Sequence, residues 1–282
     1  MTALLLAAAA LAAETPPAAY ARLESLYTEG EHEQIVEIGT ALLRRFPADP
    51  ELHWMVARAY FEVGELHARD AAAFDKEAWY SEMLRLSDAG LALDPGHGHL
   101  LFARGAALAR LGTTRGLAAS LFLADDIEAA WLAAAEDVSP YASLGREEVL
   151  PCDIYVCLGV FYRLLPDWWL VETLTGTRGS LEDSLAWQQQ AYQCSPDRVN
   201  VVKELAVSEL CVGQRGDDPG LVAAGLAHLE YAATLPSRTQ VDALDHQHVA
   251  FLLAEPSAAC AYSRDGQVEQ DRTAIRNAYA SE

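Results

Sequence analysis

Proline-containing turns recur along this chain, each after an apolar helical stretch and before a new amphipathic one. They lie at residues 46–50, 93–95, 194–197 and 235–237. Because proline lacks the backbone N–H that a helix interior needs, each turn is expected to end one helix and begin the next. Runs of alternating Val, Ile and Thr are nearly absent, so no strand is expected. The pattern predicts an all-α chain built from antiparallel helix pairs.

A similar helical segment recurs between these turns, at residues 56–64, 104–112, 158–162 and 204–210. Ala57, Gly105 and Ala206 are small enough to let neighbouring helices approach closely. The spacing of the turns exceeds the usual period of about 34 residues for helix-pair repeats. Residues 69–79 and 113–151 are therefore expected to hold insertions or extra helices.

Two segments resemble known repeat families. Residues 26–35 (LYTEGEHEQI) and 42–47 (LLRRFP) resemble a tetratricopeptide repeat, with Gly30 in its turn and Pro47 closing it. Residues 158–162, Pro166, 179–185 and 191–196 are similar to repeats of the regulator of microtubule dynamics family and, more loosely, to the T component of periplasmic TRAP transporters. The resemblance covers about residues 50–255 and implies an irregular tetratricopeptide-like solenoid with insertions.

The two ends of the chain differ in character from the middle. Residues 1–13 (MTALLLAAAALAA) form a short apolar run with a small-x-small ending, which is typical of a secretory signal peptide. We expect a periplasmic or secreted protein; if this run is instead a helix packed on the body, the protein is cytoplasmic. The helical domain is expected over residues 16–270, followed by a polar tail at 271–282.

Charge and hydropathy narrow the classes of partner. The chain has 20 Lys and Arg against 41 Asp and Glu, a formal charge of −21, which repels phosphate backbones and anionic lipid. We therefore expect no nucleic-acid partner. No stretch reaches the roughly 18 unbroken apolar residues of a membrane helix, so no integral membrane segment is expected. A protein partner, or a small ligand, remains.

The five cysteines all lie in the second half of the chain, and their spacings match no zinc or redox motif. Disulfides are possible in an exported protein, although the sequence leaves their pairing open. The odd number leaves at least one thiol unpaired within the monomer. The cysteines are Cys152, Cys157, Cys194, Cys211 and Cys260.

Motifs of catalysis and metal binding are missing. The sequence has no His-Glu-x-x-His, Gly-x-Ser-x-Gly, Walker or dinucleotide-binding motif, so we expect no enzyme and no cofactor. His97 with His99, and His246 with His248, are two residues apart. On a helix such residues point about 200° apart, so neither pair grips one metal ion. We interpret all four as structural.

Acidic clusters offer a further alternative, general acid–base chemistry. Asp125, Asp126 and Glu128 form one cluster, and Glu182 with Asp183 forms another. A solvated helix face explains both without further assumption. Residues 180–183 also have the form of a capping box that opens a helix.

Aromatic residues give the best candidate for a binding surface. Most are expected in the core, but Trp168 and Trp169 follow Pro166 directly. Adjacent residues on a helix lie about 100° apart, so both rings cannot easily face one core, and one is expected to line a groove. Arg163 and Arg178 bracket the pair and are candidates to meet a carboxylate; the alternative is ordinary pairing with the abundant acids.

These features predict a non-catalytic binding or scaffold protein of the bacterial cell envelope, whose helical-repeat groove holds a protein partner. The first alternative, from the TRAP resemblance, is an accessory solute-binding subunit that binds a small apolar or carboxylate ligand. It predicts a continuous apolar channel near the tryptophan pair, whereas a scaffold predicts a polar groove. An enzyme of unknown type is the third possibility.

Overall fold

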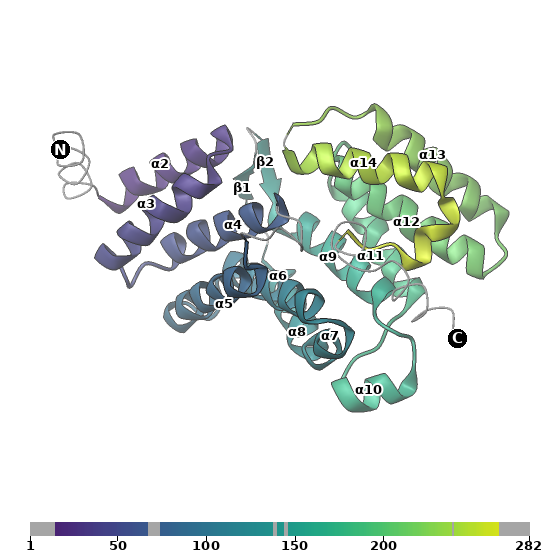
Figure 1. The fold of residues 1–282 in the computed structure, drawn as a ribbon, viewed down its shortest axis with the longest axis horizontal. Helices are drawn as coiled ribbons and strands as arrows, with labels where there is room; N and C mark the ends of the chain where they lie inside the picture. Colours follow the sequence, from purple (N-terminus) through teal and green to yellow (C-terminus); the bar gives the residue numbers. More distant parts are fainter. Residues whose placement is uncertain (1–14, 67–73, 138–139, 144–145, 239, 265–282) are drawn as a thin grey trace.

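The computed structural model describes residues 15–66, 74–137, 140–143, 146–238 and 240–264. This part of the chain is all-α apart from one short hairpin, as the sequence predicts (Figure 1). The expected leader at 1–13 and tail at 271–282 lie outside the described residues. The helices are α2 (Pro16–Glu29), α3 (His32–Arg45), α4 (Pro50–Leu66), α5 (Lys76–Leu93), α6 (Gly98–Arg115), α7 (Leu117–Phe122), α8 (Ala124–Ala134), α9 (Leu150–Leu164), α10 (Trp169–Thr175), α11 (Leu181–Cys194), α12 (Val199–Arg215), α13 (Pro219–Thr234), α14 (Gln240–Ala254) and the 3-10 helix η1 (Pro256–Ala261).

The helix ends follow local chemistry that is visible in the sequence. All four proline turns separate two helices, so this prediction is confirmed: α3 from α4, α5 from α6, α11 from α12, and α13 from α14. Gly30 ends α2 with φ of +80°, a left-handed conformation that favours glycine. The Ser180 side chain accepts a hydrogen bond from the Asp183 N–H and caps α11. Among the described helices, none is long and apolar enough to cross a membrane.

One prediction of the sequence is wrong. Strands β1 (Pro140–Ser143) and β2 (Arg146–Val149) pair antiparallel, with Pro140 opposite Val149. The segment REEV has no apolar alternation, so a strand pattern was not visible. A short hairpin needs only backbone pairing between neighbouring segments, which leaves little trace in side-chain pattern. The hairpin, α7 and α8 occupy the insertion expected at residues 113–151.

Successive helices pack side by side and bury separate apolar clusters. Helices α2 to α6 share a cluster that includes Trp54, Tyr80 and Leu100, whereas α12 to η1 share one around Val207 and Leu252. A third cluster on α6, α8 and α9 joins them. In Figure 1 the N-terminal helices lie at the left and the C-terminal helices at the upper right, with α5 to α8 below and between. The chain thus forms an arc with two ends.

Close helix approach depends on small residues, as predicted at Gly105. A β-carbon placed at Gly105 would lie 2.4 Å from Trp131 Nε1, so α6 and α8 meet only because this side chain is absent. Ala57 and Ala206 are fully buried in the same way. These positions fix how tightly the arc packs.

Two disulfides tie the C-terminal half together. Cys152 on α9 bonds Cys194 at the end of α11, with a Cα–Cα distance of 5.5 Å. Cys211 on α12 bonds Cys260 in η1, with a Cα–Cα distance of 4.7 Å. Cys157 keeps a free thiol. The sequence left this pairing open. In the structure the first bond links α9 to α11, and the second links η1 to α12.

Removing the second disulfide should cost stability. Replacing both Cys211 and Cys260 with alanine opens a link with a sequence separation of 49. We expect the free energy of unfolding to fall by about 3 kcal/mol in chemical denaturation, because the unfolded chain gains conformational freedom. Cys157→Ala, which leaves both disulfides intact, is the control. An unchanged unfolding midpoint in the double variant would show that the bond does not brace η1.

Candidate functional site

Residues 166–179 leave the α9–α11 pair and return to it as a closed loop that contains α10. The Gly179 N–H donates to the Pro166 carbonyl oxygen over 3.1 Å, and the Ser180 N–H donates to the Tyr162 carbonyl oxygen over 3.0 Å. These bonds pin the two ends of the loop together. Figure 1 shows α10 projecting away from the other helices. We call residues 166–179 the α10 lobe.

Two glycines make this closure possible. A β-carbon at Gly179 would lie 1.8 Å from the Leu165 carbonyl oxygen, so no other residue fits without moving the backbone. Gly176 ends α10 with φ of +82°, and its Cα faces the Asp125 side chain at the start of α8. The lobe is thus anchored at its base and beside α8.

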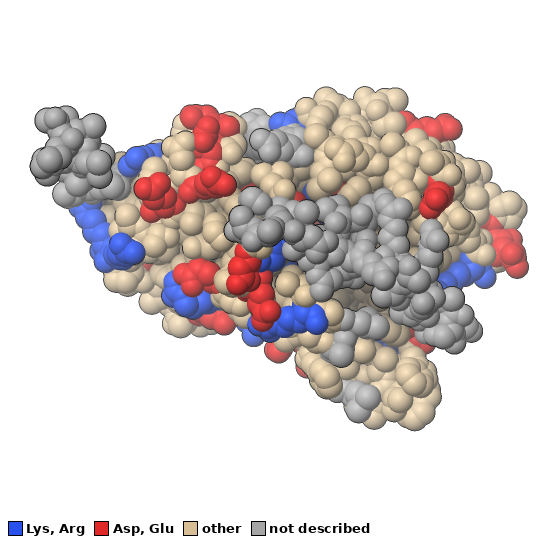
Figure 2. Space-filling model, in the orientation of Figure 1, with Lys and Arg blue, Asp and Glu red and all other residues tan. Residues whose placement is uncertain are grey.

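The lobe presents aromatic side chains to solvent. Trp168 and Trp169 are 51% and 64% exposed, and Phe122, at the end of the contacting helix α7, is 78% exposed. They are the three most exposed large apolar side chains in the described part of the chain. The protrusion that carries α10 is mostly uncharged on the face drawn in Figure 2. We call Phe122, Trp168 and Trp169 the aromatic surface.

Arg178 lies on the same lobe as the two tryptophans. Its guanidinium is half exposed and pairs with Asp167 over 3.5 Å and with Glu172 over 3.4 Å. The structure therefore brings three of the four predicted site residues together: Trp168, Trp169 and Arg178. The arginine has the ordinary acidic partners that were its alternative interpretation.

Arg163, the fourth predicted residue, lies apart from the aromatic surface. Its side chain is fully buried, and Nη1 donates to the Tyr262 carbonyl oxygen over 2.5 Å. Nη2 pairs with Glu204 over 3.1 Å. The guanidinium of Arg163 is therefore paired inside the protein, where it holds the C-terminal segment against α9 and α12.

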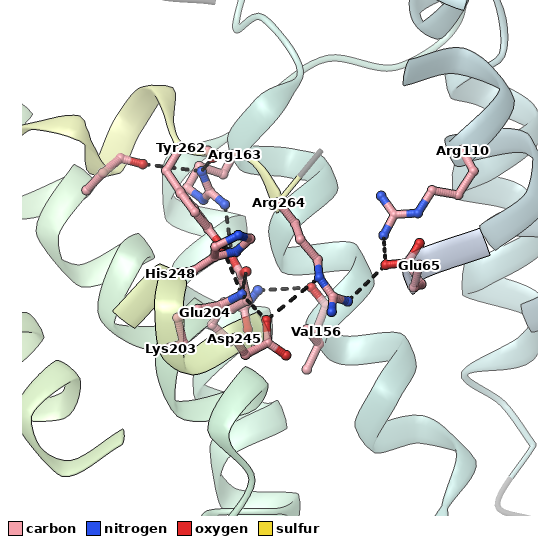
Figure 3. A network of polar contacts seen from close by, with 12 residues as sticks. Glu65, Arg110, Val156, Arg163, Lys203, Glu204, Asp245, His248, Tyr262 and Arg264 are labelled. Atoms are coloured by element: carbon pink, nitrogen blue, oxygen red, sulfur yellow. Dashed lines mark hydrogen bonds and ion pairs between the residues drawn. The ribbon is translucent and has the colours of Figure 1, made fainter. Parts of the chain in front are cut away.

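Sequence reasoning missed the buried ionic cluster around Lys203 (Figure 3). The Lys203 Nζ lies 2.8 Å from Asp245 Oδ1, 2.9 Å from Glu204 Oε1 and 2.9 Å from the Tyr262 hydroxyl. The Tyr262 hydroxyl in turn lies 2.9 Å from His248 Nδ1. A usable signal existed, because α12 carries apolar residues around its whole circumference and leaves Lys203 no solvent-facing side.

The pKa shifts in this cluster fix the protonation states of Lys203 and His248 near neutral pH. Burial alone would lower the pKa of Lys203, but the charges of Asp245 and Glu204 outweigh it and raise the pKa well above its usual range. Burial, with the positive charge of Lys203, lowers the pKa of His248 to about 4. Lys203 is thus always protonated and His248 neutral near pH 7. The arrangement holds α12, α14 and the segment after η1 together.

His97 and His99, also singled out in the sequence, have protein partners. His97 caps the start of α6, and its Nε2 lies 3.2 Å from Glu51 Oε2. The His99 ring stacks on Trp54 with a centroid distance of 4.8 Å. Within the residues the structure describes, no three His, Cys, Asp or Glu side chains are grouped to hold a metal ion.

The acidic clusters lie at helix starts, where negative charge is favourable. Asp125 and Asp126 are exposed in the first turn of α8, and Glu182 and Asp183 are exposed in the first turn of α11. Glu128 accepts a hydrogen bond from the Tyr162 hydroxyl. Each carboxylate thus has a local role that the helix end or its neighbour explains.

Comparisons with known proteins leave the family open. No protein-family model matches the sequence, and the search of curated proteins found no match. The resemblances to repeat families therefore remain proposals.

Acid should destabilise the fold through its buried histidines. Burial lowers the pKa of His99 and of His248 to about 4, below the unfolded value near 6.5. The unfolded chain then binds more protons between these values, so the free energy of unfolding falls as pH drops from about 6.5 to 4. His248→Gln should remove on the order of 2 kcal/mol of this pH dependence, measured by denaturation at several pH values. An unchanged slope would contradict the burial of a neutral His248.

A substitution at Gly179 tests whether the two ends of the lobe are held together as described. Gly179→Ala should lower the free energy of unfolding by more than about 2 kcal/mol, because the methyl group collides with the Leu165 carbonyl. Gly96→Ala is the matched control, since the nearest atom to its β-carbon lies 3.8 Å away. Denaturation curves of equal midpoint for the two variants would show that the lobe does not close as described.

Proposed function

We propose that this chain is a non-catalytic binding protein of the bacterial cell envelope, which holds an apolar segment of a protein partner against the aromatic surface. The observation that carries the proposal is the exposure of Trp168 and Trp169 on the α10 lobe and of Phe122 on α7, which contacts α10. Large aromatic side chains contribute most of the binding energy at protein interfaces and are costly to leave in water.

The α10 lobe supports this role because the direct contact between α9 and α11 lies outside it. Helices α9 and α11 pack along each other, and the lobe is an excursion between them that returns to its starting point. Ordering these residues costs conformational entropy, yet the lobe places its two tryptophans in solvent. Compact loops of this kind, held on a rigid scaffold, are frequently functional.

Charge favours a protein partner over a lipid or nucleic acid. The exposed neighbours of the tryptophans include Asp167 and Glu172, which are 63% and 53% exposed and share Arg178. With a formal charge of −21, the chain repels anionic lipid and phosphate backbones. The partner segment we propose is apolar at its centre with basic residues at its edge.

The envelope location has independent support. Two disulfides staple the C-terminal half, and such bonds persist mainly in oxidising compartments. The apolar run at residues 1–13 is typical of a signal peptide. A tetratricopeptide-like ancestry, as the sequence resemblance implies, would also fit a binding role, since helical repeats serve mostly as interaction surfaces.

The proposal is tested by native mass spectrometry of the protein isolated gently from the envelope fraction of its own host. We expect a stoichiometric protein adduct with the unaltered chain and at least a tenfold loss of this adduct with Trp168→Ala/Trp169→Ala, about 1.4 kcal/mol or more. Tyr231→Ala is the matched control, because Tyr231 is an exposed aromatic residue on α13, away from the lobe.

Other outcomes of this experiment separate the alternatives. A small bound mass lost on the tryptophan substitutions would favour an accessory solute-binding subunit of the TRAP type. A protein adduct that survives those substitutions would move the interface away from the lobe. Recovery of a bare monomer from the cytoplasm alone would overturn both the partner and the envelope location.

A further inference from the structure

Arg264 bridges the two ends of the arc. Its Nη1 lies 2.9 Å from Glu65 Oε2 on α4, and its Nε lies 3.8 Å from Asp245 Oδ1 on α14. Both carboxylates are buried, and α14 contacts α4 directly. Figure 3 shows the Arg264 side chain between the group around Glu65 and Arg110 and the group around Asp245. One guanidinium thus spans from the N-terminal to the C-terminal helices.

Each carboxylate that Arg264 contacts has a second cation as a partner. On the N-terminal side, Arg110 Nη2 pairs with Glu65 over 2.6 Å, and the Tyr80 hydroxyl also donates to this carboxylate. Glu62, the neighbouring carboxyl on α4, accepts the Tyr27 hydroxyl over 2.8 Å. The bridge can therefore open without leaving Glu65 buried and unpaired, which is the expensive case for a buried charge.

The C-terminal side is balanced in the same way. Asp245 pairs with Lys203, and Glu204 pairs with both Lys203 and Arg163. Two carboxylates and two cations thus cancel within this group. Removal of Arg264 therefore leaves Asp245 paired with Lys203, and Glu65 paired with Arg110.

Several polar atoms of this bridge also lack hydrogen bonds. Arg264 Nε and Nη2 are buried, and they make no hydrogen bond with the described residues. Asp245 Oδ2 is likewise buried without a hydrogen-bond partner there. Burying a guanidinium costs several kcal/mol, and one short bond to Glu65 and one long ion pair with Asp245 have to offset that cost. The apolar clusters of the two ends are separate, so they add little to this contact.

We infer that Glu65 and Asp245 form a guanidinium-binding site that Arg264 fills, and that this contact is a reversible latch closing the arc. When Arg264 leaves, each half keeps its fold and the two ends move apart about the central helices α8 and α9. The inference is independent of the partner proposed for the aromatic surface.

The test measures the distance between the two ends in the full chain. Spin labels at Glu33→Cys on α3 and Glu230→Cys on α13, both exposed positions, report it in a Cys157→Ala background. We expect Arg264→Ala to fold but to give longer and broader distances than the unaltered chain. Arg238→Ala, which removes an exposed ion pair with Asp197, is the matched control and should leave the distances unchanged.

Chemical rescue provides the second readout. Millimolar guanidinium chloride should narrow the distances of Arg264→Ala towards those of the closed chain, whereas sodium chloride at equal ionic strength should not. Failure of Arg264→Ala to fold would overturn the latch, because Glu65 and Asp245 each keep another cation partner without this residue. Distances identical to those of the unaltered chain would overturn it as well.

Discussion

The buried ammonium of Lys203 is the constraint on which the C-terminal half depends. Helix α12 is enclosed on all sides, so this charge cannot reach water and must find partners inside. Asp245 on α14 and Tyr262 after η1 supply them. A buried charge is tolerated only when it is paired and hydrogen-bonded, so α14 and the following segment have one acceptable register on α12. That register also carries Arg264 to the N-terminal helices and holds Arg163 away from the aromatic surface.

Much of the helical architecture could be predicted from the sequence because it is encoded locally. Each proline turn ended a helix, Gly30 formed a turn, and Ser180 began a helix, since these residues act on their own backbone. The hairpin at residues 140–149 was missed because its pairing leaves no apolar alternation. The ionic cluster was missed because it joins Lys203 to residues about 40 to 60 positions away in the chain, and no local pattern reports such contacts.

Of the candidate site, too, only part could be predicted from the sequence. The sequence predicted that one ring of the Trp168–Trp169 pair lines a groove, whereas both rings are exposed, and Trp168 has extended backbone before α10 rather than a helical position. Arg163, close to them in sequence, faces the opposite environment because α9 turns it into the interior. The closure of the lobe was not foreseeable, because it depends on how near Gly179 comes to the Leu165 carbonyl. A helical scaffold braced by buried ions thus carries a small lobe whose two tryptophan rings are exposed to solvent.

The most direct test of this account is a double-mutant cycle on the buried pair, with Lys203→Met, Asp245→Leu and the double variant compared by chemical denaturation. Each single substitution removes one partner from a buried charge and should cost about 3 to 5 kcal/mol of unfolding free energy. The double variant should cost less than the sum by at least about 2 kcal/mol, because neither charge is then left alone. Additive costs, or single substitutions as mild as those at the surface, would contradict the claim that this ion pair sets the register of the C-terminal half.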